Sequence, residues 1–327
     1  MAMLVDGKWD EHADHTTIAD GRYERRESLF RDWITADGSS GFAAEPGRYH
    51  LYIAHWCPWA YRTAIFRTLK GLEDVVGISV ASSSRKEQGW MFVNEHDQST
   101  DAVYGKRYLH ELYTLADSGY TGRPTVPTLW DRERQTVVSN ESSDIIRMLN
   151  DAFDELVPGT PDYYPAELRA EIDAVDAVVY ERVNNGVYRA GFATSQEAYD
   201  EAIQALFGTL DELEHRLDAS RYLCGGQITE ADWRLFSTLI RFDQAYYQIF
   251  KCSQKHIYEY PNLWNYTLEL YQHPGIAEVT HFEDIRIGYF ATMPDLNPSG
   301  IVPPGPDLDY LAAHDRERLP ATFVGRT

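Results

Sequence analysis

The sequence predicts a two-domain protein in which an α/β domain at residues 48–150 precedes an all-α domain at residues 165–283. Strand-like and helix-like segments alternate in the first region, which is typical of a βαβ arrangement. The second region carries apolar residues at helical spacing over most of its length. Residues 151–164, which contain Pro158, Gly159 and Pro161, separate the two regions and are interpreted as a linker.

The elements of the first domain follow one another in a defined order. The first strong strand, RYHLYIA at 48–54, is rich in aromatic and β-branched residues. A helix begins directly after it with Pro58 in the first turn, where the missing N–H is not needed. The elements that follow are a buried strand at 75–81, a helix at 108–116, a hairpin at 125–130 and 136–139, and a helix from 141 to 149. The order β-α-β-α-β-β-α is that of a thioredoxin-like domain.

The remaining regions are predicted from their periodicity and composition. The all-α domain is expected to contain helices at 165–188, 196–217, 229–250 and 261–272. Thr229, followed by Asp232 three positions later, resembles a capping box that begins the third of these helices. Residues 1–47 are polar and are expected to form a surface extension with little chemistry, and residues 284–327, rich in Pro and Gly, are expected to form an extended tail.

The composition limits the classes of function. A formal net charge of −21 disfavours nucleic acid and anionic membrane surfaces as partners, so small-molecule chemistry is favoured. The sequence contains neither an apolar run of about 18 residues nor a signal-peptide pattern, so a cytoplasmic location is expected. The three cysteines, Cys57, Cys224 and Cys252, are too widely spaced for a disulfide framework or a zinc-type pair, and no metal is expected.

Cys57 is the strongest candidate for chemistry. It lies between a predicted strand and a predicted helix, where backbone N–H groups and the positive end of the helix dipole favour a thiolate, so we expect a lowered pKa. Ala60 occupies the place of the second cysteine of a Cys-x-x-Cys pair. A lone thiolate cannot resolve its own mixed disulfide, so this step needs an external thiol. The alternative interpretation of Cys57 is a small buried residue in a turn.

Glu141 and Ser142 open the last predicted helix of the first domain. Exposed N–H groups at a helix start favour a carboxylate, and an acidic side chain can face an amine, so the pair suits the α-amino acid head group of a γ-glutamyl thiol. A helix cap explains the same residues equally well. Pro127, fourteen residues earlier, is predicted at a sheet edge or in a cis peptide bond because it cannot donate to a strand ladder.

Taken with further motifs, these residues resemble the glutathione transferase superfamily and, within it, the Xi class or glutathionyl-hydroquinone reductases. The motifs are Cys-Pro-Trp-Ala at 57–60, Gly-Trp-Met-Phe at 89–92, Thr-Val-Pro-Thr-Leu-Trp-Asp at 125–131, Asn-Glu-Ser-Ser-Asp-Ile at 140–145, Asn-Asn-Gly-Val-Tyr-Arg-Ala-Gly-Phe-Ala at 184–193, Arg-Phe-Asp-Gln-Ala-Tyr at 241–246, Phe-Lys-Cys at 250–252 and Asn-Pro-Ser-Gly-Ile-Val-Pro at 297–303. The last four belong to this class rather than to transferases in general.

The resemblance implies a glutathione transferase fold, a homodimer and a reduction. The Cys57 thiolate attacks the sulfur of a glutathionyl-hydroquinone, expels the hydroquinone and is left in a mixed disulfide that a second glutathione resolves. In the family, a tryptophan packs on the thiol, the backbone before a cis-proline contacts it, a Glu-Ser pair binds its head group, and two tyrosines lie over the quinone. These roles correspond to Trp90, Val126 with Pro127, Glu141 with Ser142, and Tyr188 with Tyr289.

The tail departs from the family pattern. Members of the family usually have the sequence His-Tyr-Tyr-x-Ser-His in this tail, whereas this chain has Gly288 and Met293 in place of the two histidines. The quinone side of the pocket is therefore open to a different acceptor. The co-substrate is expected to be glutathione or γ-glutamylcysteine, since both carry the γ-glutamyl head group.

Two other functions remain open alongside the reduction of glutathionyl-hydroquinones. One is a broader glutaredoxin-like or dehalogenating thiol transferase, since the same Cys57 chemistry reduces other activated sulfur bonds. The other is a non-catalytic transferase-fold module for dimerisation or ligand storage, and it predicts that Cys57→Ser leaves function unchanged.

Overall fold

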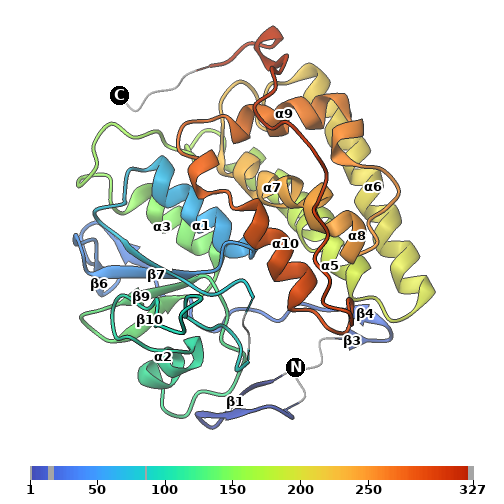
Figure 1. Ribbon diagram of the computed structural model, residues 1–327. Helices are drawn as coiled ribbons and strands as arrows, with labels where there is room; N and C mark the ends of the chain where they lie inside the picture. Colours follow the sequence, from blue (N-terminus) through green and yellow to red (C-terminus); the bar gives the residue numbers. More distant parts are fainter. Residues whose placement is uncertain (1, 14–17, 85–86, 323–327) are drawn as a thin grey trace. The chain divides into compact units, whose positions relative to one another are not determined.

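The computed structural model describes residues 2–13, 18–84 and 87–322 of the chain (Figure 1). The chain divides into two units, one made of residues 1–16 and 27–160 and the other of residues 17–26 and 161–327. A short N-terminal segment therefore belongs with the C-terminal unit.

Within the described part of the chain, the first unit is built on a four-stranded sheet with the order β10-β9-β7-β8. The central strand β7 (Tyr49–Ile53) pairs in parallel with β8 (Gly77–Val80) and antiparallel with β9 (Thr128–Asp131). Strand β9 in turn pairs antiparallel with β10 (Thr136–Ser139). All five residues of β7 are buried, which fits the aromatic and β-branched composition of this strand.

Helices cover both faces of this sheet. Helix α1 (Pro58–Leu69) packs against α3 (Ser142–Asp151) on one face, and α2 (Leu109–Ala116) lies on the other face against β10 (Figure 1). The predicted order β-α-β-α-β-β-α is confirmed. The peptide bond between Val126 and Pro127 is cis, which confirms one of the two alternatives expected for this proline.

The N-terminal residues of this unit contribute to its core. They form the hairpin of β1 (Met3–Val5) and β2 (Lys8–Asp10) and the parallel pair of β5 (Ile34–Thr35) and β6 (Phe42–Ala43). The buried apolar residues of this region are Leu4, Ile34 and Phe42. Leu4 also exchanges two backbone hydrogen bonds with Gly122, at 2.9 and 3.0 Å. The predicted surface extension is therefore partly internal.

Helices dominate the second unit. The α-helices are α4 (Arg169–Val179), α5 (Gly186–Gly191), α6 (Gln196–Ala219), α7 (Glu230–Arg241), α8 (Tyr247–Ile249), α9 (Pro261–Tyr271) and α10 (Phe282–Ala291). The π-helical turns are η1 (Tyr180–Asn184) and η2 (Phe242–Tyr246), and the 3-10 turns are η3 (Ile257–Glu259), η4 (Ala277–Val279) and η5 (Arg316–Arg318). The segment at residues 17–26 adds a hairpin of β3 (Ile18–Ala19) and β4 (Arg22–Tyr23).

The capping box predicted at Thr229 is confirmed. The Thr229 backbone N–H and its Oγ1 donate to Asp232 Oδ2 at 2.7 and 3.0 Å, and α7 begins at the next residue. Across residues 2–13, 18–84 and 87–322, no helix combines the length and the apolar character needed to cross a membrane.

Three of the sequence-based expectations for this unit were wrong. The helices expected at 165–188 and 229–250 are divided by η1 and η2, because a π-turn inserts an extra residue that the hydrophobic pattern does not reveal. The extended tail expected at 284–327 begins later, since α10 continues to Ala291. The abundant Pro and Gly residues lie after this helix, whereas Phe282, Ile285 and Tyr289 have the helical spacing, and Ile285 and Tyr289 are buried.

Candidate active site

Cys57 is placed by the junction between β7 and α1. It is the N-cap residue of α1, with Pro58 at the first helical position, and its N–H donates to the Ala54 carbonyl at 3.1 Å. The side chain is 6% exposed, so little of the sulfur reaches solvent. Its Sγ lies 3.6 Å from the carbonyl oxygen of Val126, the residue before the cis bond to Pro127. The structure therefore brings three of the predicted site residues together.

Trp90 lies beside the same turn. Its ring centroid is 4.9 Å from that of Trp56, which immediately precedes Cys57, and the two planes are tilted by 41°. Trp90 is 9% exposed, and its carbonyl accepts a hydrogen bond from the Leu109 N–H at 3.0 Å, which ties the loop to the start of α2. An aromatic surface thus stands next to the thiol.

Glu141 caps helix α3. Its Oε1 accepts hydrogen bonds from the Ser143 N–H at 3.1 Å and the Ser143 hydroxyl at 3.0 Å, and its Oε2 accepts from the Ser28 hydroxyl at 3.0 Å. Burial raises the pKa of Glu141, but these hydrogen bonds and the nearby charge of Arg62 outweigh burial, so the pKa lies below its ordinary value. The carboxylate is therefore charged and held in one position at neutral pH.

Ser142 stands at the first position of α3. It is 2% exposed, and its Oγ has no hydrogen-bond partner among residues 2–13, 18–84 and 87–322. A buried hydroxyl without a partner is uncommon and costs stability, which makes it a candidate contact for a bound group. The N–H groups of the first helical turn lie at the same place and favour an anion.

Three tyrosine hydroxyls form a chain in the second unit. Tyr188 on α5 and Tyr289 on α10 lie 2.7 Å apart, oxygen to oxygen, and Tyr246 at the end of η2 lies 2.9 Å from Tyr289. We call Tyr188, Tyr246 and Tyr289 the phenol triad. Burial, followed by the neighbouring phenols, raises the pKa of Tyr289 well above its ordinary value, while Arg241 acts in the opposite direction. The central member is therefore a neutral phenol at physiological pH.

The sequence matches family models in both halves. Residues 56–152 match the glutathione S-transferase N-terminal domain, and residues 196–268 match the C-terminal domain of the same family. The glutathionyl-hydroquinone reductase YqjG of Escherichia coli is 47% identical over 324 residues, which are 97% of this chain and 99% of the relative. This chain belongs to the glutathionyl-hydroquinone reductase family, the Xi class of glutathione transferases.

Other comparisons agree with this family. The glutathionyl-hydroquinone reductase PcpF of Sphingobium chlorophenolicum is 47% identical over 306 residues and covers 94% of this Xi-class chain and 96% of its own. Among solved structures, the Xi-class transferase from Natrialba magadii matches with a TM-score of 0.92 and 46% identity over 98% of both chains. The glutathione-bound structure of YqjG matches with a TM-score of 0.88 and 46% identity over 96% of this chain and 99% of that one.

The N-terminal segment of the Xi-class chain supplies polar groups that the sequence analysis missed. Ser28 contacts Glu141 within the first unit, as described above. Within the second unit, the Arg25 guanidinium lies 5.0 Å from the ring centroid of Tyr188, and Arg25 Nε donates to Asn185 Oδ1 at 2.8 Å. Contacts of this segment with the candidate residues Glu141 and Tyr188 were not expected from the sequence. The sequence of residues 1–47 contains no pattern that would indicate contacts with residues more than a hundred positions away.

The other two cysteines have different surroundings. Burial, with a smaller contribution from Asp232, raises the pKa of Cys224 to about 12. Cys252 is fully buried, and burial raises its pKa still further. Both thiols are therefore protonated at physiological pH and unsuited to nucleophilic attack.

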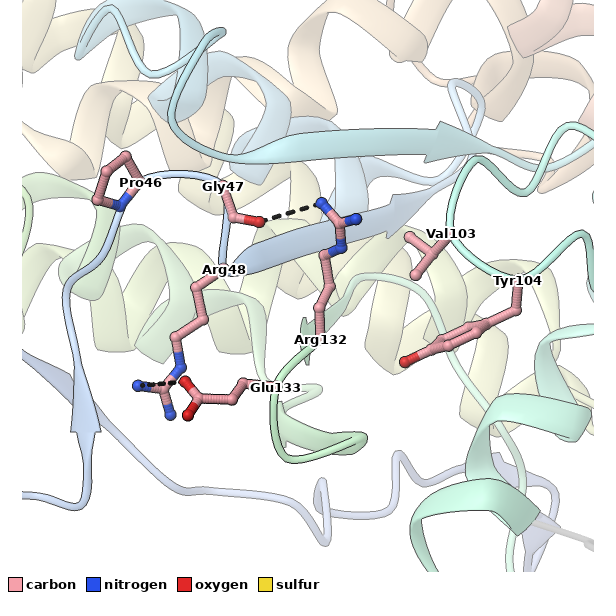
Figure 2. A pocket seen from close by; sticks show the side chains of 7 residues that line it. All are labelled: Pro46, Gly47, Arg48, Val103, Tyr104, Arg132 and Glu133. Carbon is pink, nitrogen blue, oxygen red and sulfur yellow. Dashed lines mark hydrogen bonds and ion pairs between the residues drawn. The ribbon is translucent and has the colours of Figure 1, made fainter.

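A cavity of about 480 Å³ lies elsewhere in the first unit (Figure 2). Its lining residues are Pro46, Gly47, Arg48, Val103, Tyr104, Arg132 and Glu133. Arg48 is paired with Asp131 at 2.6 Å and with Glu133 at 3.4 Å, and Arg132 Nη1 donates to the Gly47 carbonyl at 3.1 Å. Because carboxylates neutralise Arg48 and none of the predicted site residues lines this cavity, we do not assign the thiol site to it.

Proposed function

We propose that this protein reduces glutathionyl-hydroquinones to hydroquinones, with glutathione as the co-substrate and Cys57 as the nucleophile. The observation that carries the proposal is the position of Cys57, at the N-cap of α1 and 3.6 Å from the carbonyl that precedes the cis bond to Pro127. The names of YqjG and PcpF state the same reaction for those relatives, and the YqjG structure contains glutathione.

Three side chains and two backbone segments of the first unit are proposed to hold glutathione. The γ-glutamyl carboxylate would accept hydrogen bonds from Ser142 and the first turn of α3, and the Glu141 carboxylate would face the amino group. The backbone of Val126, before Pro127, would pair with the extended peptide, as an exposed strand edge does. Trp90 would pack against the ligand beside the sulfur. γ-Glutamylcysteine shares the head group and would use the same contacts.

The chemistry requires one thiolate and one external thiol. The Cys57 sulfur attacks the glutathione sulfur of the conjugate, an S–S bond forms, and the bond from sulfur to the quinol carbon breaks. Its electron pair passes to the quinol, which takes up a proton and leaves in reduced form. A second glutathione thiolate then attacks the mixed disulfide, which yields glutathione disulfide and restores the Cys57 thiolate. The absence of a second cysteine at Ala60 suits this scheme.

Tyr188 and Tyr289 are proposed to act on the quinol. In the keto tautomer of the conjugate, the electron pair released from the C–S bond reaches the quinol oxygen, where negative charge develops. A phenol hydroxyl that donates to this oxygen would stabilise the transition state by about 2–4 kcal/mol if the geometry is favourable. Tyr188 is the exposed end of the pair, since it retains 8% exposure and Tyr289 retains none.

Mass spectrometry after exposure to a glutathionyl-hydroquinone tests the proposal. We expect a glutathione adduct on Cys57 together with free hydroquinone, and neither in Cys57→Ser. Cys224→Ser is the matched control and should behave as the unaltered protein, because Cys224 is buried with a raised pKa. Hydroquinone release by Cys57→Ser would refute the assignment of the nucleophile.

A broader glutaredoxin-like or dehalogenating thiol transferase is the second candidate. It is supported by Gly288 and Met293, which stand where the family usually has histidines. Turnover of a simple glutathione mixed disulfide, compared with that of the quinol conjugate, separates the two functions. We expect a higher kcat/KM for the conjugate. Faster turnover of the mixed disulfide would support the broader activity.

A further inference from the structure

Ser28, in the N-terminal segment, contacts the turn that carries Glu141. Its hydroxyl lies 3.0 Å from Glu141 Oε2 and 3.2 Å from the carbonyl oxygen of Asn140. Both oxygens can only accept, so Ser28 is the donor, and its single proton goes to one of them at a time. The carboxylate oxygen is the nearer and carries charge, which makes it the stronger acceptor. Neither the sequence analysis nor the proposed function gives Ser28 a role.

We propose that Ser28 is a positioning residue for glutathione: by donating to Glu141 Oε2, it holds the carboxylate so that the remaining lone pair of this oxygen receives the amino group of the γ-glutamyl head. This inference rests on the proposed function, because it concerns the head group that Glu141 would face. It extends that function to a residue that acts through Glu141.

The number of acceptor positions on Glu141 indicates where the amino group binds. A carboxylate has about four such positions, two on each oxygen. Oε1 uses both, because the N–H and the hydroxyl of Ser143 donate to it at 3.1 and 3.0 Å. In the part of the chain that the structure describes, the donor to Oε2 is Ser28 alone, so one position on Oε2 remains for a ligand. Ser28 and an ammonium group would therefore share this oxygen.

The two oxygens of Glu141 depend on side chains to different degrees. If the Ser143 hydroxyl is removed, the Ser143 N–H still donates to Oε1. If the Ser28 hydroxyl is removed, Oε2 has no donor among the described residues. The last torsion of a glutamate side chain is broad, so the carboxylate could then turn about its Oε1 contact. The lone pair of Oε2 would no longer keep one direction.

Backbone pairing holds Ser28 in place. Two residues after it, the Phe30 carbonyl accepts a hydrogen bond from the Asn140 N–H at 3.2 Å, and the Phe30 N–H donates to Asn140 Oδ1 at 3.2 Å. The Asp32 N–H donates to the Val138 carbonyl at 2.9 Å. The segment thus pairs with β10, an edge strand of the four-stranded sheet, whose outer backbone groups are available for such an addition.

Side chains reinforce this pairing. The Phe30 ring meets Tyr113 edge to face with centroids 5.6 Å apart, and it stacks on Tyr120 at 5.6 Å with planes 17° apart. Arg31 Nη2 donates to Asp144 Oδ1 at 2.9 Å, and its Nε donates to Oδ2, which makes the pair bidentate. Because Asp144 lies in the first turn of α3, the segment is fixed relative to the start of this helix.

Binding of two ligands to the full chain tests the proposal. One is glutathione, and the other is an analogue in which glutarate replaces the γ-glutamyl residue, so that only the amino group is missing. Titration calorimetry gives both Kd values, and the ratio of analogue to glutathione measures the contribution of the amino group. Ser28→Ala should raise the Kd for glutathione about 3- to 10-fold and leave that of the analogue within about twofold. A general structural defect would weaken both ligands alike, and an unchanged ratio would overturn the proposal.

Further variants complete the test. Ser28→Thr keeps the hydroxyl and should retain the ratio of the unaltered protein. Ser40→Ala removes an exposed hydroxyl of the same N-terminal segment, which contacts Thr35 and Phe42, and it should leave both Kd values unchanged. If Ser28→Ala does not fold, Ser28→Cys, whose thiol is a weak donor, should lower the ratio. A full ratio in Ser28→Cys would then overturn the proposal.

The outcomes also separate this inference from the proposed function. If the unaltered protein binds no glutathione, the proposed function is overturned and this inference with it. If it binds glutathione and the analogue equally, Glu141 does not hold the amino group, and the role of Ser28 is overturned without any effect on the chemistry of Cys57. If glutathione is preferred and Ser28→Ala keeps the full ratio, only the role of Ser28 is overturned.

Discussion

Ser142→Ala is expected to leave the ligand-free protein as stable as before while weakening its hold on glutathione. The Ser142 hydroxyl is buried without a partner among the described residues, so alanine removes an unsatisfied group. An unsatisfied hydroxyl costs about 1–3 kcal/mol, and we expect the free energy of unfolding to stay constant or to rise by about 1 kcal/mol.

The same substitution removes a donor to the proposed γ-glutamyl carboxylate. A hydrogen bond to a charged group contributes about 1.5–3 kcal/mol, so the Kd for glutathione should rise about 10- to 100-fold. Urea unfolding with and without glutathione measures both effects. At a glutathione concentration about 100 times the Kd, the ligand stabilises the unaltered protein by about 2.7 kcal/mol, and a tenfold weaker Kd reduces this increment to about 1.4 kcal/mol.

Ser143→Ala is the matched control on the neighbouring residue. Its hydroxyl donates to Glu141 Oε1 at 3.0 Å, so its removal should cost about 1 kcal/mol without ligand. The increment produced by glutathione should be largely retained. The reasoning about Ser142 would be refuted if Ser142→Ala lost more than about 1 kcal/mol without ligand, or if it kept the full glutathione-dependent increment.

The remaining predictions concern the tail, one carboxylate and the thiols. Arg316→Ala should lower the free energy of unfolding, measured by urea unfolding, by about 2–4 kcal/mol, because this buried guanidinium donates three hydrogen bonds of 2.7 Å to carbonyls at the end of α6. The control is Arg318→Ala, which removes an exposed guanidinium and should lower it by less than about 1 kcal/mol. The folded pKa of Glu141 lies below the unfolded value of about 4.3, so the stability that this carboxylate contributes is complete above that pH and is lost as the pH falls through the folded pKa. Glu141→Gln should therefore lose less stability on acidification than the unaltered protein. An identical pH dependence of the two proteins would contradict this. Iodoacetamide at neutral pH should modify Cys57 and leave Cys224, whose pKa is raised to about 12, unmodified, as peptide mass mapping can check.

Local sequence patterns predicted the parts of the fold that depend on interactions between neighbouring residues. The strand before Cys57 and Pro58 after it place the cysteine at a strand-helix junction, because aromatic and β-branched residues favour strands and proline favours the first helical position. The capping box at Thr229 follows equally from neighbouring residues, and the sequence limited Pro127 to two alternatives, of which the cis bond is one. These features were predictable because each depends on backbone conformation and short-range hydrogen bonds.

The π-turn that carries Tyr246 was not predictable in this way. The apolar residues of α7, the helix that leads into η2, recur at helical spacing, and η2 itself is five residues long. One extra residue in so short a segment changes the hydrophobic pattern too little to distinguish a π-turn from a continuous α-helix.

The contacts that join distant residues depend on the packing of complete elements. Ser28 meets Glu141 across 113 positions, and Tyr188 meets Tyr289 across 101. The sequence indicated that Cys57, Glu141 and two tyrosines have suitable chemistry, and the family resemblance indicated their roles. Neither indicated that Ser28 contacts the Glu141 carboxylate or that Tyr246 contacts Tyr289. Side chains so far apart along the chain come within hydrogen-bond distance only after the sheet and the helices have packed.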